Sequence, residues 1–147
     1  MLARKLKDIE YDCIVVLTPH WQTYIGNHFL GLERFQNISV DPIFPNLFRF
    51  HHDIEVDVEL SEAMQKSAED AGIVSMMMRN PNFRVDYGTI VSCHMLNPEW
   101  DKPIVTISSN RSTHYYSDEV MNEQASALGL AVSKAIEESG KKVVLVA

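Results

Sequence analysis

The amino-acid sequence predicts an α/β domain with a mostly parallel central sheet and helices on both faces. Short β-branched runs alternate along the chain with longer segments in which apolar residues have helical spacing. Strands that alternate with helices in this way usually lie parallel, joined by right-handed crossovers. With 147 residues, 46% of them hydrophobic, the chain is long enough to form one domain with its own core.

The first third of the chain predicts one strand and a long loop. Residues 1–10 have the pattern of the end of an amphipathic helix, and residues 13–17 form an apolar run typical of a buried parallel strand. Pro19 has no N–H to donate, so we expect it to end the strand and to leave His20 just past the carboxyl end. Residues 22–50 show no sustained period and predict a loop packed by its own apolar side chains.

The rest of the chain alternates regularly between helical and strand patterns. Glycine follows the two longest helical patterns, where it can take the left-handed conformation that ends a helix. The predicted elements, in order, are a helix over 56–71 ended by Gly72, a strand over 73–78, a turn at 80–82, a helix over 89–96 stopped by Asn97-Pro98, a strand over 103–108, a helix from Ser117 or Asp118 to Ser139 ended by Gly140, and a strand over 141–147.

The two ends of the chain do not match those of a complete parallel sheet. The sequence opens inside a helical pattern and closes on the last residue of a strand pattern. A parallel sheet usually opens with a strand, and its last strand is usually covered. We therefore expect residues 1–147 to form a single partial domain that lacks its first strand and its carboxyl-terminal half.

Composition excludes several classes of function. The net charge is −7 and no basic tract is present, which argues against nucleic-acid or anionic-membrane binding. No apolar stretch approaches the roughly 20 residues of a membrane span, and the amino terminus lacks the apolar region of a secretory signal. With Cys13 and Cys93 as the two cysteines, a disulfide is not expected and a cytoplasmic location is favoured.

Six histidines are the main candidates for chemistry. No two of them have the i, i+4 spacing of zinc proteases, and the sequence has no Cys-x-x-Cys, Gly-x-Ser-x-Gly or Gly-x-Gly-x-x-Gly motif. Hydrolase and nucleotide-binding functions therefore have no motif support. The histidines are His20, His28, His51, His52, His94 and His114.

His20 has the most informative position. Ligands of open α/β sheets bind beyond the carboxyl ends of the strands, where His20 is expected. From position alone it is either a metal ligand or a rim histidine bonded to backbone. Trp21 could form the wall of a pocket for an aromatic ligand, and His28, within reach along the same loop, is interpreted as a packing or supporting residue.

The other histidines have simpler interpretations. His51 and His52 precede several acidic residues and predict a solvated loop before a helix, with a metal role as the alternative. His94 is expected to be partly buried on a short helix, and His114 to lie in an exposed loop.

Tyr87 stands in Asp86-Tyr87-Gly88, where glycine permits a close backbone approach just before a predicted helix. Its hydroxyl could bond an oxygen group of a ligand. A capping or core role for this tyrosine is equally consistent with the sequence.

Taken together, four segments of the chain resemble the class III extradiol ring-cleavage dioxygenases. The resemblance runs along essentially the whole chain. The segments are Thr-Pro-His20-Trp21, Gly-Asn-His28-Phe-Leu-Gly31, Val-Asp-Pro-Ile-Phe-Pro-Asn-Leu-Phe-Arg49 and Arg-Asn-Pro-Asn-Phe-Arg-Val-Asp-Tyr87-Gly88-Thr89.

This resemblance implies a non-haem Fe(II) held by two histidines and one glutamate, with positions open for an aromatic substrate and O₂. His20 matches one of the two histidine ligands. Many members have Asp-His-Gly where this chain has Asp86-Tyr87-Gly88; those that open aminophenol rings have tyrosine. The resemblance thus implies 2-aminophenol or a catechol as substrate, Tyr87 as a substrate contact, Asp86 as a residue that orients the loop, and a homo- or hetero-oligomer with a related subunit.

The chain also departs from the family. In the family, the other histidine ligand lies on a strand before the point that matches residue 1. The family's acid–base histidine follows the strand that matches the one ending at Ala147, and its glutamate ligand lies much further on, so the resemblance implies that this chain matches the amino-terminal half of such a subunit. One histidine holds Fe(II) poorly, so little activity is expected of this chain alone. The alternatives are a metal-free, non-catalytic subunit of the same fold and, with less support, a zinc hydrolase built on His20 with His51 or His52.

Overall fold

The computed structural model describes residue 6 and residues 8–41, 43–111 and 113–147. The helix predicted over residues 1–10 lies largely outside them. The elements found in the described residues are the strands β1 (Cys13–Thr23), β2 (Asn27–Leu30), β3 (Arg34–Val40), β4 (Arg49–Glu55), β5 (Ser75–Met78), β6 (Ile104–Asn110) and β7 (Val143–Val146), and the helices α2 (Val58–Asp70), α3 (Tyr87–Leu96) and α4 (Asp118–Ser139).

Five of the strands form one sheet in the order β5-β2-β6-β1-β7. The pairs β1–β6, β1–β7 and β2–β5 are parallel, and β2 pairs with β6 in the antiparallel direction. Three of the four neighbouring pairs are thus parallel, which confirms the predicted mostly parallel sheet. The remaining strands, β3 and β4, form a separate antiparallel hairpin.

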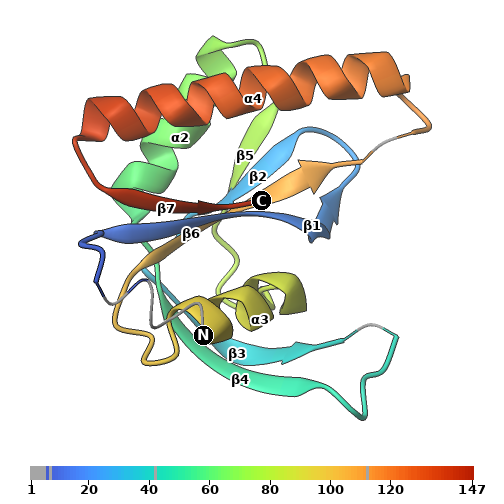
Figure 1. The fold of residues 1–147 in the computed structure, drawn as a ribbon. Helices are drawn as coiled ribbons and strands as arrows, with labels where there is room; N and C mark the ends of the chain where they lie inside the picture. Colours follow the sequence, from blue (N-terminus) through green and yellow to red (C-terminus); the bar gives the residue numbers. More distant parts are fainter. Residues whose placement is uncertain (1–5, 7, 42, 112) are drawn as a thin grey trace.

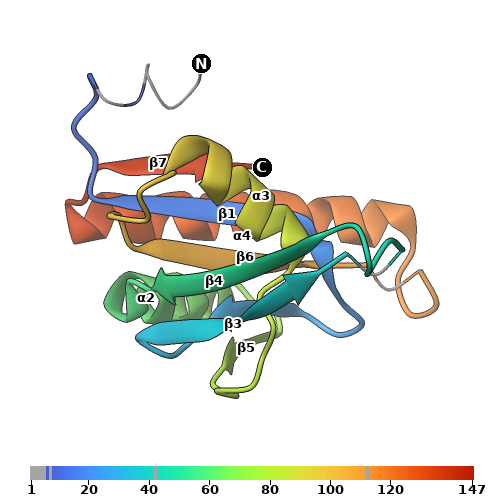
Figure 2. The same ribbon diagram turned by 90° about the horizontal axis from the view of Figure 1, so that it is seen from below.

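Helices cover both faces of the sheet, as predicted. Helices α2 and α4 lie side by side over one face, and α3 with the β3–β4 hairpin lies over the other (Figures 1 and 2). Side chains of β1 alternate between the two sides: Cys13 and Val15 pack toward α2 and α4, whereas Ile14 and Val16 pack toward α3. The sheet therefore separates two hydrophobic cores.

The ends of α2 and α4 agree with their sequence signals. The side chains of Asp57 and Ser117 accept the backbone N–H groups of Leu60 and Val120 and so act as N-caps. Gly72 and Gly140, which follow the helices, have φ of +81° and +67°, a conformation that glycine adopts without a Cβ penalty. The helical spacing of Met121, Ala125, Leu128, Val132 and Ala135 predicts one buried stripe on α4. In the structure Ala125 is exposed, and the buried residues are Leu128, Ala131, Val132 and Ala135.

The prediction that Pro19 ends the first strand is wrong. Strand β1 continues to Thr23, but its ladder with β6 is irregular: Thr18 pairs with Ser108, and the next pair joins Gln22 to Ser109. Three residues of β1 thus have no counterpart in β6. Because proline cannot donate to the ladder, pairing stops at this point and resumes beyond a bulge.

The prediction of a long loop over residues 22–50 is also wrong. This stretch contains β2, β3 and the start of β4. The hairpin is half-buried, and its buried positions include polar residues such as Ser39 and His52. Polar side chains at inward positions conceal the apolar–polar alternation by which a strand is identified in a sequence.

His51 and His52 therefore lie in β4 and not in a solvated loop before a helix. His51 is exposed, whereas His52 faces inward and is 4% exposed. His94, predicted to be partly buried, is exposed on α3, and His114 lies in an exposed turn as predicted.

No helix in the described part of the chain is long and apolar enough to span a membrane.

Candidate functional site

The bulge in β1 exposes His20 near the start of α3. The residues on either side of the bulge remain in the ladder with β6, whereas His20 does not pair there. Its backbone N–H donates instead to the Thr18 hydroxyl, 3.1 Å away. The bulge thus places His20 outside the β1–β6 ladder, and its backbone N–H is hydrogen-bonded to a side chain instead.

Asp86 orients the segment that opposes His20. Its carboxylate caps α3 by accepting the Thr89 backbone N–H at 2.9 Å and the Thr89 hydroxyl at 2.8 Å. The same carboxylate accepts the Thr18 hydroxyl at 2.9 Å. Asp86 therefore connects the first turn of α3 to β1.

The side chains of His20 and Tyr87 lie against each other. Their ring centroids are 4.4 Å apart, and the Tyr87 hydroxyl is 3.5 Å from His20 Nε2. Gly88 makes this approach possible, because a Cβ at this position would lie 2.5 Å from His20 Cδ2. The structure thus brings together two residues that are 67 positions apart in the sequence.

These two side chains border a cavity of about 310 Å³ beside the bulge of β1. This volume is at the small end of the range for small-molecule sites, ~300–1,000 Å³. The wall is mostly apolar around a few polar groups. It is formed by Val16, Leu17, Thr18, Pro19, His20, Tyr87, Gly88, Val91, Ser92, Val146 and Ala147.

Trp21 and His28 do not line this cavity. Trp21 is 7% exposed and packs in the core beneath α3 and the hairpin, with its ring 4.8 Å from that of Phe83. His28 lies on β2, where its ring meets the edge of Trp21 at 6.1 Å, and burial lowers the pKa of its imidazole. Trp21 and His28 therefore contact each other and lie outside the wall of this cavity.

Neither cysteine has the properties of a catalytic nucleophile. Cys13 and Cys93 are unpaired, as predicted, and fully buried. Burial raises the pKa of each thiol to about 12, and for Cys93 the negative charge of Asp86 acts in the same direction. Both thiols stay protonated at neutral pH and lack the reactivity of a thiolate.

Within the described residues, no group of three or more His, Cys, Asp or Glu side chains is placed to hold a metal ion. His52 has two buried ring nitrogens without a hydrogen-bond partner, and burial lowers the pKa of its imidazole, but it is not among the residues that line the cavity. At the cavity, the exposed imidazole of His20 could serve as one metal ligand. It occupies space that a Cβ at Gly88 would fill. A complete metal site there would need further ligands.

Sequence reasoning did not identify Thr18, Val91 or the end of β7 as parts of this site. Thr18 stands in the Thr-Pro pair that ends the apolar run, but its hydrogen-bond partner Asp86 is 68 positions away. Val146 and Ala147 reach the cavity because β7 pairs beside β1. Such contacts depend on strand order, which the sequence did not reveal.

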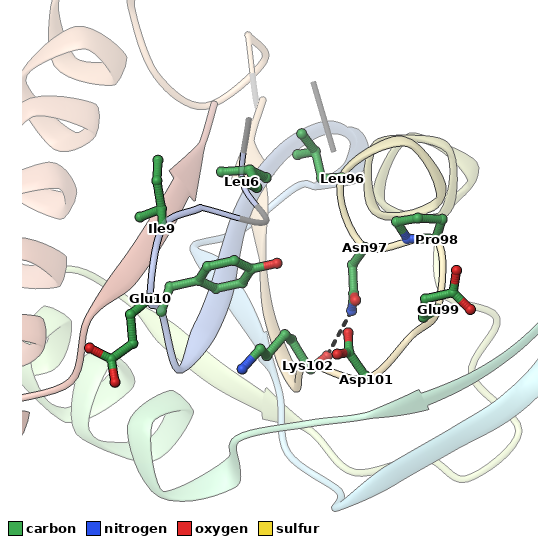
Figure 3. Close-up of a pocket in the computed structure, with 10 residues that line it drawn as sticks. Leu6, Ile9, Glu10, Leu96, Asn97, Pro98, Glu99, Asp101 and Lys102 are labelled. Carbon is green, nitrogen blue, oxygen red and sulfur yellow. Dashed lines mark hydrogen bonds between the residues drawn. The ribbon is translucent and has the colours of Figure 1, made fainter. Parts of the chain in front are cut away.

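A second hollow, of about 240 Å³, lies beside the amino end of β1 (Figure 3). Its wall includes residues 96–99, Asp101 and Lys102, and the Asn97 side-chain amide donates to the Lys102 carbonyl at 3.0 Å. None of the predicted site residues lines it. The cavity beside His20 is taken as the candidate functional site because both His20 and Tyr87 line it.

Comparison with known proteins identifies the class. Residues 1–147 match the family described as the catalytic LigB subunit of aromatic ring-opening dioxygenase. The match covers the whole chain, so the protein belongs to this family of class III extradiol dioxygenases.

Individual relatives are more specific. The chain is 49% identical over 142 residues to the 2-aminophenol 1,6-dioxygenase beta subunit of Pseudomonas sp, covering 97% of this chain and 47% of that protein. It is 28% identical over 146 residues to the alpha subunit of the same enzyme, covering 99% and 51%. To the 3,4-dihydroxyphenylacetate 2,3-dioxygenase of Escherichia coli it is 22% identical over 147 residues, again covering 99% and 51%. The chain thus spans about half the length of these relatives.

Proposed function

We propose that this chain is part of a dioxygenase subunit that opens the ring of 2-aminophenol, or of a catechol, with non-haem Fe(II) and O₂. The observation that carries the proposal is the meeting of His20 and Tyr87 at one cavity, their rings 4.4 Å apart. The 49% identity to a 2-aminophenol 1,6-dioxygenase beta subunit supports the choice of substrate.

In this proposal His20 is one of the ligands of the iron. An exposed imidazole is a suitable ligand for Fe(II), which bound here would supply open coordination positions for the substrate and O₂. Since the described residues offer no three-ligand group, the other ligands would come from parts of the full-length protein that this sequence does not include.

Tyr87 and the apolar wall would hold the substrate. The Tyr87 hydroxyl, 3.5 Å from His20 Nε2, can hydrogen-bond an amino or hydroxyl group of a ring bound next to His20. Val16, Leu17 and Val91 offer apolar surface against which the ring packs and from which water is excluded.

We also propose a hetero-oligomer with a related subunit, in the cytoplasm. The proposed hetero-oligomer is supported by the similarity of this chain to both an alpha and a beta subunit. Two free cysteines, both buried, are consistent with a reducing compartment.

Oxygen uptake tests this function. A protein that carries this sequence at the full length of its relatives is loaded with Fe(II) without air and then supplied with O₂ and 2-aminophenol, catechol or phenol. We expect uptake with the first two compounds, because each has two adjacent ring substituents, and none with phenol. Replacing Tyr87 by Phe should raise KM about tenfold through loss of one hydrogen bond, and the control His94→Ala should leave KM unchanged. No uptake with either of the first two compounds would overturn the proposal.

A metal-free, non-catalytic subunit of the same fold is the second candidate. This candidate agrees with the finding that the described residues hold no group of three or more His, Cys, Asp or Glu side chains placed to hold a metal ion. In that case the full-length protein would bind no iron, and His20→Ala would alter neither metal content nor assembly.

A further inference from the structure

We propose that Thr18 is a positioning residue that fixes His20 relative to Tyr87. The inference rests on the proposed function, in which these two side chains act on one bound substrate. It assigns a role to a residue whose side chain hydrogen-bonds to neither the imidazole of His20 nor the phenol of Tyr87.

The Thr18 hydroxyl uses its donor and an acceptor at the same time. It accepts the backbone N–H of His20 at 3.1 Å and donates to Asp86 Oδ2 at 2.9 Å. The Thr18 residue is 1% exposed, so water cannot readily replace either partner. The hydroxyl thus joins the bulge that presents His20 to the carboxylate that caps α3.

The other end of this link is equally fixed. Asp86 binds the backbone N–H and the hydroxyl of Thr89, which is fully buried in the first turn of α3. Tyr87 follows Asp86 directly and is the first residue of α3. Displacement of the carboxylate would therefore move Tyr87 with it.

A purely structural cap would not require Thr18. The N-cap of α3 is complete with Asp86 and Thr89, and Thr18 donates to no backbone group of the helix. Its two hydrogen bonds instead lead to the backbone of His20 and to the residue before Tyr87. Because a displacement of about 1 Å can reduce catalysis about 100-fold, a link of this kind controls the rate through geometry.

The test compares Thr18→Val with Thr18→Ser. Valine has nearly the same shape as threonine without a hydroxyl, whereas serine retains the hydroxyl. The present chain, free of metal, is labelled with 3-fluorotyrosine, and the ¹⁹F signal of Tyr87 is assigned as the one missing from Tyr87→Phe. We expect that signal to shift or broaden in Thr18→Val and to stay in place in Thr18→Ser. The signal of Tyr115, which is 71% exposed, serves as the internal control.

Kinetics of the full-length, iron-loaded protein form the second arm. Thr18→Val should lower kcat by at least about tenfold with a smaller change in KM. Thr18→Ser should retain most of the wild-type kcat. If the Thr18→Val protein does not fold, Thr18→Ala is used in its place, because it removes the same two hydrogen bonds.

The two arms separate the two proposals. An unchanged Tyr87 signal in the hydroxyl-free variant would overturn the role of Thr18, whatever the activity. A shifted signal in a full-length protein that takes up no oxygen would support the positioning of the pair and overturn the dioxygenase function.

Discussion

At the scale of single residues, Gly88 determines how closely His20 approaches α3. A Cβ at Gly88 would lie 2.5 Å from His20 Cδ2 and 3.1 Å from the Thr18 hydroxyl oxygen. Both distances are shorter than ordinary contacts. Any other residue at this position would push the exposed imidazole away from Tyr87.

Replacing Gly88 by Ala should therefore weaken Fe(II) binding with little effect on the stability of the fold. The free energy of unfolding should change by less than about 1 kcal/mol, since alanine favours the helix and the exposed His20 ring can swing aside. The affinity of the full-length protein for Fe(II) should fall about 10- to 100-fold, because the ligand loses its orientation. Urea unfolding and a metal-competition titration measure the two quantities.

Gly129 on α4 provides the matched control, because a Cβ there would meet no atom within 4 Å. Gly129→Ala should leave the Fe(II) affinity unchanged. Equal affinities in both alanine variants would show that Gly88 does not position His20.

At this scale the sequence predicted two residues of the candidate site. His20 and Tyr87 were both predicted as candidates, and the structure brings their rings into contact. Trp21 and His28 were grouped with His20 because they are neighbours in the sequence. The bulge and the core packing of Trp21 instead direct them away from the cavity, an outcome that depends on the pairing of β1 with β6.

At the scale of elements, Asp57 connects the start of α2 to the segment before β7. One carboxylate oxygen accepts the Leu60 backbone N–H at 3.1 Å, and the other accepts the Lys141 ammonium at 2.6 Å. The Asp57 side chain is 11% exposed and that of Lys141 30%. This ion pair is better shielded from solvent than the exposed i, i+4 pairs on the helix surfaces.

The hydrogen bond to Asp57 raises the pKa of Lys141 above its ordinary value of 10.5. A group whose pKa is raised by folding stabilises the protein below its unfolded pKa, and this stabilisation is lost as pH rises through the folded pKa. The contribution of the pair should therefore be complete at neutral pH and disappear above about pH 10.5.

Urea unfolding of three variants tests this link. Asp57→Asn keeps an oxygen for the cap and loses the ion pair, and Lys141→Met should destabilise the protein by a similar amount at neutral pH. Asp57→Ala loses both the N-cap and the ion pair, and should lower the free energy of unfolding by about 1 kcal/mol more than Asp57→Asn. In strong alkali the difference between wild type and Lys141→Met should vanish. A difference that persists there, or an equal effect of Lys134→Met on the helix surface, would contradict the account.

The success of sequence reasoning varied between elements for physical reasons. Helices α2 and α4 are long, periodic and capped by local residues, so the sequence predicted both. The β3–β4 hairpin escaped prediction because inward positions such as Ser39 and His52 are polar. Strand order was not predictable, since β6 lies between β1 and β2 through contacts made across more than 70 residues.

At the scale of the whole molecule, the sheet gathers the site at one place. The stretch of β1 that leads into its bulge, the start of α3 and the end of β7 meet around the cavity. The described residues contribute one exposed imidazole there, and the chain spans about half the length of its relatives. The central claim is that this imidazole, His20, is an iron ligand of the full-length dioxygenase.

The iron content of the full-length protein tests this claim most directly. Wild type, His20→Ala and the control His94→Ala are loaded with Fe(II) without air, freed of excess metal by gel filtration and analysed for iron per chain. We expect about one iron in wild type and in the control. Loss of a ligand should weaken binding by at least about 100-fold, leaving His20→Ala nearly free of iron. A His20→Ala protein that retains as much iron as wild type would contradict the account.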